Sequence, residues 1–130
     1  SSFQVLATDH GWDKWGNFPI EQERLYSYIN NSKDVKTIII SGDRHIGGIY
    51  YKNFNDLQLL EITSSSLNKP LHFLVSENDS YQVGDIVTQA NFGLIKIDWT
   101  RGDVIMELRS TRLGSISSTI KSILDYKFKL

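Results

Sequence analysis

The chain has 130 residues, of which 40% are hydrophobic, and this size and composition predict a single packed domain. Its 14 basic and 15 acidic residues are interspersed and give a net charge of −1, so nothing in the charge pattern indicates a surface for nucleic acid or acidic lipid. The absence of cysteine excludes disulfides and thiolate ligands, which leaves His, Asp, Glu and Asn to bind any metal. No apolar run approaches the roughly 20 residues that span a bilayer.

The first thirty residues predict a short strand, an irregular segment and a helix. Residues 1–7 contain an apolar stretch that is typical of an edge strand. Residues 8–19 combine polar groups with two tryptophans, a mixture found both in binding loops and in structural loops pinned by aromatic side chains. Pro19 suits the first turn of a helix, and apolar residues then recur near helical spacing. We therefore expect a helix over residues 19–30.

A run of three isoleucines forms the centre of the next predicted element. Residues 35–41 predict a strand buried on both faces, and Gly42 follows it. Asp43 and His45 come at the mouth of this strand, where an i, i+2 spacing in extended chain would point both side chains to one side. A carboxylate and an imidazole can together bind zinc, iron or manganese. The alternative is that Asp43 caps a turn and His45 is an ordinary strand residue.

The remainder of the chain predicts two hairpins separated by a long loop. Residues 46–51 and 57–63 form the first hairpin, and residues 92–99 and 104–109 form the second. Residues 68–90 show no firm periodicity and indicate a loop, in which His72 is expected to pack among apolar neighbours. The tail, particularly residues 115–125, fits a helix and a strand equally well.

Four segments carry a resemblance to a known family: SGDRH at residues 41–45, DHGWDKWGNFPIEQERL before it, and LLEITSSSL and ANFGLIKIDW after it. In order and spacing they resemble the C-terminal part of a PhoD-like alkaline phosphatase, within the metallophosphoesterase (calcineurin-like) superfamily. The resemblance covers about residues 5–108. One departure is Ser66, which stands where the family has a proline.

The resemblance implies an α/β fold, namely the C-terminal half of a metallophosphoesterase-type αββα sandwich with a mixed β-sheet and one clear helix. The family usually ends with another strand, which favours an extended segment over residues 115–125. PhoD-like enzymes are several times longer, and their first metal-binding motifs are not found here. We therefore expect residues 1–130 to be a single domain from the C-terminal part of a longer enzyme, whose missing N-terminal part completes the site. Its relatives are often exported to the periplasm or the cell exterior.

The activity that the resemblance implies is hydrolysis of a phosphate mono- or diester at a site with two divalent or trivalent metal ions, drawn from iron, manganese, calcium and zinc. The superfamily usually ends its motifs with a Gly, His, any, His segment, and here Asp43 takes the place of the first His. His45 is expected to bind one metal, while Asp43 binds the second or orients His45. A further ligand is expected upstream, with Asp13 as the first candidate and His10 as the second.

Arg44 lies beside these ligands and is the candidate catalytic residue, because a guanidinium group matches a phosphate through two hydrogen bonds. The alternative is an arginine paired with an acid. Since a half site binds metal weakly, we expect the isolated chain to be inactive. A second hypothesis is a non-catalytic binding domain that holds a partner through the aromatic loop at residues 12–18, with an exposed sheet edge that allows a dimer.

Overall fold

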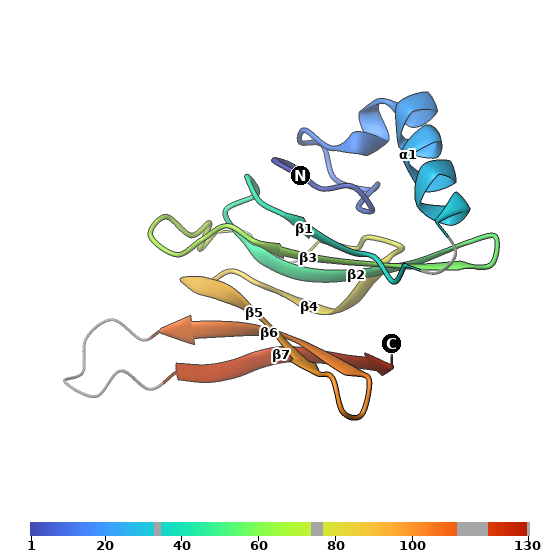
Figure 1. Cartoon of the computed structure of the whole chain (residues 1–130). Coiled ribbons are helices and arrows are strands. Elements are labelled where there is room, and N and C mark those ends of the chain that lie inside the picture. The colour runs from blue at the N-terminus through green and yellow to red at the C-terminus, as the bar shows by residue number, and fades with distance from the viewer. Residues whose placement is uncertain (33–34, 74–76, 112–119, 130) are drawn as a thin grey trace.

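A computed structural model describes residues 1–32, 35–73, 77–111 and 120–129, and in it the chain forms three layers (Figure 1). The N-terminal segment and helix α1 (Pro19–Asn31) cover one face of a four-stranded sheet. The other face of this sheet packs against a three-stranded sheet. The expected α/β class, with one α-helix and a mixed sheet, is confirmed for the described residues. No helix in this part of the chain is long and apolar enough to cross a membrane.

The four-stranded sheet contains β1 (Ile38–Ser41), β2 (Gly47–Phe54), β3 (Leu57–Ser64) and β4 (Gln82–Val87), in the order β1-β3-β2-β4. Strands β1 and β3 are parallel, and β2 is antiparallel to both β3 and β4. Because β1 and β3 run parallel with Ser41 opposite Thr63, their carboxyl ends meet at one edge of the sheet. The segment that follows β1 therefore lies beside the segment that follows β3.

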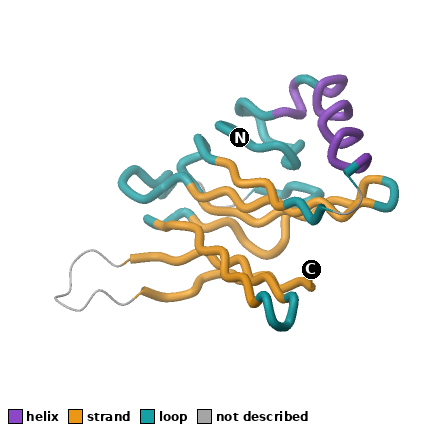
Figure 2. The backbone as a smooth tube through the Cα atoms, in the orientation of Figure 1, coloured by secondary structure: helices purple, strands orange, loops and turns teal. Residues whose placement is uncertain are grey.

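The three-stranded sheet is an antiparallel meander of β5 (Asn91–Asp98), β6 (Asp103–Thr111) and β7 (Ile120–Lys129) (Figure 2). The first two strands are the predicted second hairpin, and Gly102 adopts a φ of 63° in its turn, a conformation that favours glycine. The tail is extended over residues 120–129, as the family resemblance favoured, whereas residues 115–119 lie outside the described residues.

Two apolar cores hold the layers together. The first lies between α1, the N-terminal segment and the outer face of the four-stranded sheet, and its buried members are Val5, Leu6, Ala7, Tyr26, Ile39, Tyr50 and Leu59. The second lies between the two sheets and consists of Ile49, Leu60, Ile62, Val87, Val104, Met106 and Leu108. Every strand of the four-stranded sheet thus contributes buried residues to at least one of the two cores, and β2 and β3 contribute to both.

Several local predictions are wrong. Residues 1–7 form no strand, because the N–H groups of Val5 and Leu6 donate to the side chain of Glu61 rather than to a neighbouring strand. Strand β1 is not buried on both faces: it is an edge strand, and Ile40 is 60% exposed. The predicted loop over residues 68–90 contains β4, whose pattern is broken by a glycine and an acid, and His72 within that loop is exposed.

Candidate functional site

A tight turn connects β1 to β2 and carries the predicted ligands. Asp43 has a φ of 68° and His45 a φ of 54°, so both lie in the left-handed region that residues other than glycine seldom adopt. The N–H of Arg44 donates to the carbonyl of Gly42 at 2.9 Å. The predicted extended geometry of Asp43 and His45 is therefore wrong. Two strained residues in one turn cost stability, and such strain clusters at functional sites.

The imidazole of His45 is held by a neighbouring loop. Its Nδ1 lies 2.8 Å from the carbonyl oxygen of Lys69, and the N–H of Leu71 donates to the His45 carbonyl at 3.0 Å. Because a carbonyl only accepts, Nδ1 carries the proton and Nε2 keeps its lone pair. Metal-binding histidines are typically oriented in this way, by donating their other ring N–H to a backbone carbonyl. In the neutral ring, Nε2 of His45 is therefore the nitrogen whose lone pair could bind a cation.

The other predicted acidic ligands are free on the surface but do not converge. Asp43 and Asp13 are both exposed. Among the described residues, no group of three or more His, Asp or Glu side chains could hold a metal ion. The fold therefore does not gather His45, Asp43, Asp13 and His10 into one closed site.

His10, in the loop before α1, is buried and only 9% exposed. Its Nδ1 accepts a hydrogen bond from the N–H of Trp12 at 3.2 Å, so the neutral ring carries its proton on Nε2, which has no partner among the described residues. Burial, together with the positive charge of Arg44, lowers the pKa of His10 to about 4. His10 is therefore neutral at pH 7, but neither ring nitrogen offers a free lone pair in this arrangement.

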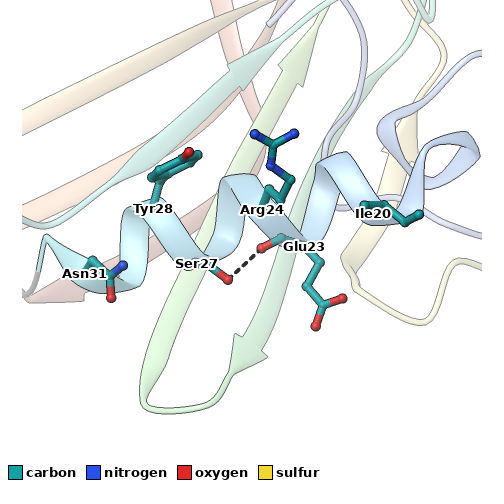
Figure 3. A pocket seen from close by; sticks show the side chains of 6 residues that line it. All are labelled: Ile20, Glu23, Arg24, Ser27, Tyr28 and Asn31. Atoms are coloured by element: carbon teal, nitrogen blue, oxygen red, sulfur yellow. Dashed lines mark hydrogen bonds between the residues drawn. The ribbon is translucent and has the colours of Figure 1, made fainter.

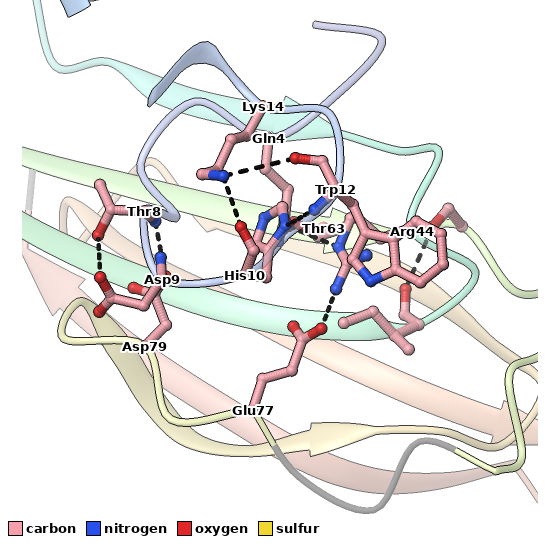
Figure 4. A network of polar contacts seen from close by, with 12 residues as sticks. Gln4, Thr8, Asp9, His10, Trp12, Lys14, Arg44, Thr63, Glu77 and Asp79 are labelled. Atoms are coloured by element: carbon pink, nitrogen blue, oxygen red, sulfur yellow. Dashed lines mark hydrogen bonds and ion pairs between the residues drawn. The ribbon is translucent and has the colours of Figure 1, made fainter. Parts of the chain in front are cut away.

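Arg44 points into the same interior region, as Figure 4 shows, and is 3% exposed. Its Nε donates to Oε1 of Gln4 at 3.0 Å, and its Nη2 forms an ion pair with Glu77. The guanidinium carbon also lies 5.8 Å from the ring centre of Trp12. The alternative of an arginine paired with an acid is thus the arrangement observed, and a phosphate would have to displace Glu77 to reach this guanidinium group.

A buried chain of polar side chains extends from Arg44 into the sheet. Gln4 donates through Nε2 to Oγ1 of Thr63 at 2.9 Å (Figure 4). Thr63 Oγ1 in turn lies 2.8 Å from Oγ of Ser41. This chain joins the N-terminal segment to the carboxyl ends of β1 and β3. The hydrogen bonds end at Ser41, the residue before Gly42 at the start of the turn. Nothing in the sequence could have revealed this role of Gln4.

Glu61, in the centre of β3, holds the N-terminal segment on the sheet. Its carboxylate is fully buried and accepts hydrogen bonds from the N–H of Val5 at 3.0 Å and of Leu6 at 2.6 Å. Burial raises the pKa of Glu61, against the opposing effect of these hydrogen bonds and of Ser41. An acid among apolar residues of a predicted strand was the available signal, and the sequence reasoning missed it.

The loop at residues 65–71, which orients His45, is itself anchored at two points. Ser65 donates its N–H to the carbonyl of Ile46 at 3.2 Å. Ser66 is fully buried, donates through Oγ to the carbonyl of Gln89 at 3.2 Å, and accepts from the side chain of Asn91. Ser66 thus ties this loop to the connection between β4 and β5.

A shallow depression lies on the outer side of α1, away from the turn. Figure 3 shows its lining residues, which are Ile20, Glu23, Arg24, Ser27, Tyr28 and Asn31. Ile20 and Tyr28 are both exposed, whereas Gln22 and Tyr26 are buried. The side chains of Gln22 and Tyr26 both donate to the carbonyl of Val5, which explains why this face of the helix turns inward.

Comparisons of the chain with protein-family models, curated proteins and solved structures find no match. A function must therefore be argued from the site itself and from the residues quoted above.

Proposed function

We propose that this chain forms part of a PhoD-like, metal-dependent phosphoesterase that hydrolyses phosphate mono- or diesters at a two-metal site. The observation that carries the proposal is the orientation of His45. Its Nδ1 is bound to the Lys69 carbonyl, which leaves Nε2 as a ready ligand in the turn that follows the edge strand β1. An imidazole with no ligand role gains little from being held in a turn whose backbone is strained at two residues.

The position of the turn in the fold supports the same proposal. In open α/β sheets, ligands bind beyond the carboxyl ends of the strands, and the turn follows β1 where that strand ends beside the parallel strand β3. The α–β–β order of the layers is also compatible with one half of an αββα sandwich. These two features describe where the turn lies in the fold. The chemistry proposed for the site depends on His45 and its neighbours.

The donor set fits a metal ion of intermediate or hard character. His45 would hold one ion through Nε2, and the exposed carboxylates of Asp43 and Asp13 are oxygen ligands of the kind that iron, manganese or calcium accept. When bound, two such ions would supply a hydroxide nucleophile at neutral pH and would neutralise charge on the phosphoryl oxygens. Arg44 is proposed to steady the turn through Gln4 and Glu77, and to bind phosphate only if Glu77 is displaced.

The proposal requires further ligands from another stretch of polypeptide. The described residues gather no group of three His, Asp or Glu side chains, and a cation held by one or two side chains keeps most of its water. The 130-residue chain alone is therefore expected to bind metal weakly and to be inactive. A longer polypeptide that contains this chain is expected to bind two ions and to be active.

The test is metal content by mass spectrometry, together with hydrolysis of bis(4-nitrophenyl) phosphate, on the full-length gene product. His45→Ala should remove at least one ion per chain and lower the hydrolysis rate by at least about 100-fold. His72→Ala is the matched control, because His72 is exposed and lies outside the turn, and it should change neither quantity. A full-length protein that holds no metal after dialysis against Mn²⁺, Zn²⁺ and Fe²⁺ would overturn the proposal.

A second candidate function, a binding domain, is favoured by one observation on the opposite layer. Phe18, Ile20 and Tyr28, at the start of α1 and along it, are each more than half exposed, and so is Trp12 in the loop before the helix. Exposed large apolar side chains are typical of an interaction surface, and the partner we propose is a second copy of the chain. Sedimentation velocity should then show a concentration-dependent dimer that Ile20→Ser weakens and Ile97→Ser, an exposed isoleucine in β5, does not.

A further inference from the structure

A cavity of about 380 Å³ lies between the two edge strands β1 and β5 and is closed on one side by the loop that holds His45. This volume is within the range of pockets that bind small organic molecules. Its apolar lining comes from Ile40, Ile62, Leu67, Phe92 and Ile95. Among the described residues, no Lys, Arg, Asp or Glu side chain lines the cavity, so a charged group placed inside it would find no opposite charge there.

Gly93 forms a tightly packed part of the cavity wall. A Cβ on Gly93 would lie 3.3 Å from Cβ of Ser64 and 3.4 Å from Cδ1 of Ile62, and both of these residues line the cavity. The backbone of Gly93 is not in the left-handed region, so its conformation does not require glycine. Glycine inside a strand often marks a position where another segment of the chain approaches closely. The absence of a side chain at Gly93 therefore lets β5 pack against β3 along one wall of the cavity.

The polar groups around the cavity are mostly used within the protein. Ser64 donates through Oγ to Oδ1 of Asn91 at 3.0 Å, and Ser65 donates through Oγ to the carbonyl of Ile46 at 3.3 Å. The amide of Asn91 donates to the carbonyl of Gln89 at 2.8 Å. The side chain of Asn68 makes no hydrogen bond with the described residues and is left to contact a ligand. An apolar group with one hydroxyl or ether oxygen matches this lining.

The same loop connects the cavity to His45. Leu67 and Asn68 line the cavity, and the next residue, Lys69, orients the His45 imidazole. We propose that the cavity binds the uncharged, apolar group esterified to the phosphate, so that the substrate is an aryl or alkyl phosphate ester rather than a nucleotide or a sugar phosphate. This assignment of substrate class rests on the proposed phosphoesterase function, whereas binding in the cavity can be measured without metal or activity.

The experiment is a titration of the ¹⁵N-labelled 130-residue chain with 2-naphthol, which carries the apolar ring and no phosphate, followed by NMR. Amide signals of Ser64, Ser65, Asn68 and Gly93 should shift, and the polar ring compound inositol should leave them unchanged. Ile40→Ser should weaken 2-naphthol binding by at least about fivefold, because it removes apolar surface from the rim. Ile97→Ser is the same substitution in an exposed isoleucine of β5 outside the cavity, and it should have no effect.

A second variant tests the cavity from the other side. Gly93→Ala adds only a methyl group, which presses on Ser64 and Ile62 in the cavity wall, so it should weaken the naphthol shifts while its chemical shifts elsewhere remain those of the folded chain. Absence of shifts in the wild-type chain, or equal affinity of Ile40→Ser and Ile97→Ser, would overturn the binding site.

The substrate class is tested separately on the full-length gene product. Its kcat/KM should be at least about tenfold higher for 2-naphthyl phosphate than for inositol phosphate, and Ile40→Ser should reduce that preference mainly through KM. Naphthol binding in the cavity of a protein that hydrolyses no phosphate ester would overturn the substrate class and the proposed function, but not the binding site. Hydrolysis without that preference would overturn the substrate class alone.

Discussion

Gly47 and Asn91 are packed so closely that no side chain fits between them. A Cβ on Gly47 would lie 2.8 Å from Oδ1 of Asn91 and 3.0 Å from Cδ2 of Leu108. Asn91 is almost fully buried and fixes Ser66, whose loop orients His45. The contact therefore joins the start of β2, the second sheet and the candidate metal-binding turn.

Replacing Gly47 with alanine should destabilise the protein by about 1–3 kcal/mol, because the added methyl group must push Asn91 or Leu108 from a packed position. Urea unfolding measures the loss. Gly11→Ala is the matched control, since a Cβ on Gly11 meets nothing within 4 Å, and it should change the free energy of unfolding by less than about 0.5 kcal/mol. Equal effects of the two substitutions would contradict this account of Gly47.

The ion pair of Arg44 and Glu77 predicts a large effect in the interior. Arg44→Met should cost about 3–5 kcal/mol in the free energy of unfolding, because it leaves the Glu77 carboxylate in a largely buried site without its cation. The double variant Arg44→Met/Glu77→Gln should recover part of that loss. Arg24→Met removes an exposed ion pair with Glu21 and should cost less than about 1 kcal/mol. A double variant no more stable than Arg44→Met would show that the pairing is not what stabilises this region.

Glu61→Ala should release the N-terminal segment from the sheet. The substitution leaves the N–H groups of Val5 and Leu6 without their acceptor in a buried place, which costs about 2–3 kcal/mol. Hydrogen exchange at these two amides should accelerate well before global unfolding, and Glu23→Ala, on the exposed side of α1, should leave both amides protected. Unchanged protection in Glu61→Ala would show that other contacts hold the segment.

The pKa of His10 predicts a dependence of stability on pH. The pKa of His10 is about 4 in the folded chain and 6.5 ordinarily, so the unfolded chain binds the additional proton between these values. The free energy of unfolding should therefore fall as the pH decreases from 6.5 towards 4, by an amount on the order of 3 kcal/mol. Glu61 acts in the opposite sense, because its raised pKa contributes stability at low pH that is lost as the pH rises.

The effect of His10 is isolated by comparison with His10→Asn, in which an amide oxygen can still accept the N–H of Trp12. Urea unfolding from pH 4 to pH 7.5 should show a steeper loss of stability on acidification in the wild-type chain than in the variant. Parallel pH profiles would mean that His10 titrates normally in the folded protein.

Much of the fold follows from local patterns. The proline and the helical spacing after it located α1 to within one residue at its end, and alternation around polar turns located both hairpins. These features are set by neighbours in the sequence, through the rigid proline ring and the two-residue period of a strand. Strand β4 escaped detection because Gly84 and Asp85 interrupt its pattern, and pairing with β2 overrides that local signal.

For the candidate site, the sequence by itself determined which side chains are available to bind a metal ion or a phosphate. Asp43, Arg44 and His45 are consecutive residues shortly after a run of isoleucines. Only the tertiary structure decided what each can do. Lys69 orients His45 from 24 residues away, and Glu77 pairs with Arg44 from 33 residues away. Glu61 accepts a hydrogen bond from Val5, which lies 56 residues earlier in the chain. Hydrogen bonds between distant segments depend on how the sheets pack and leave no periodic trace in the chain, so a pattern of residues could not reveal them.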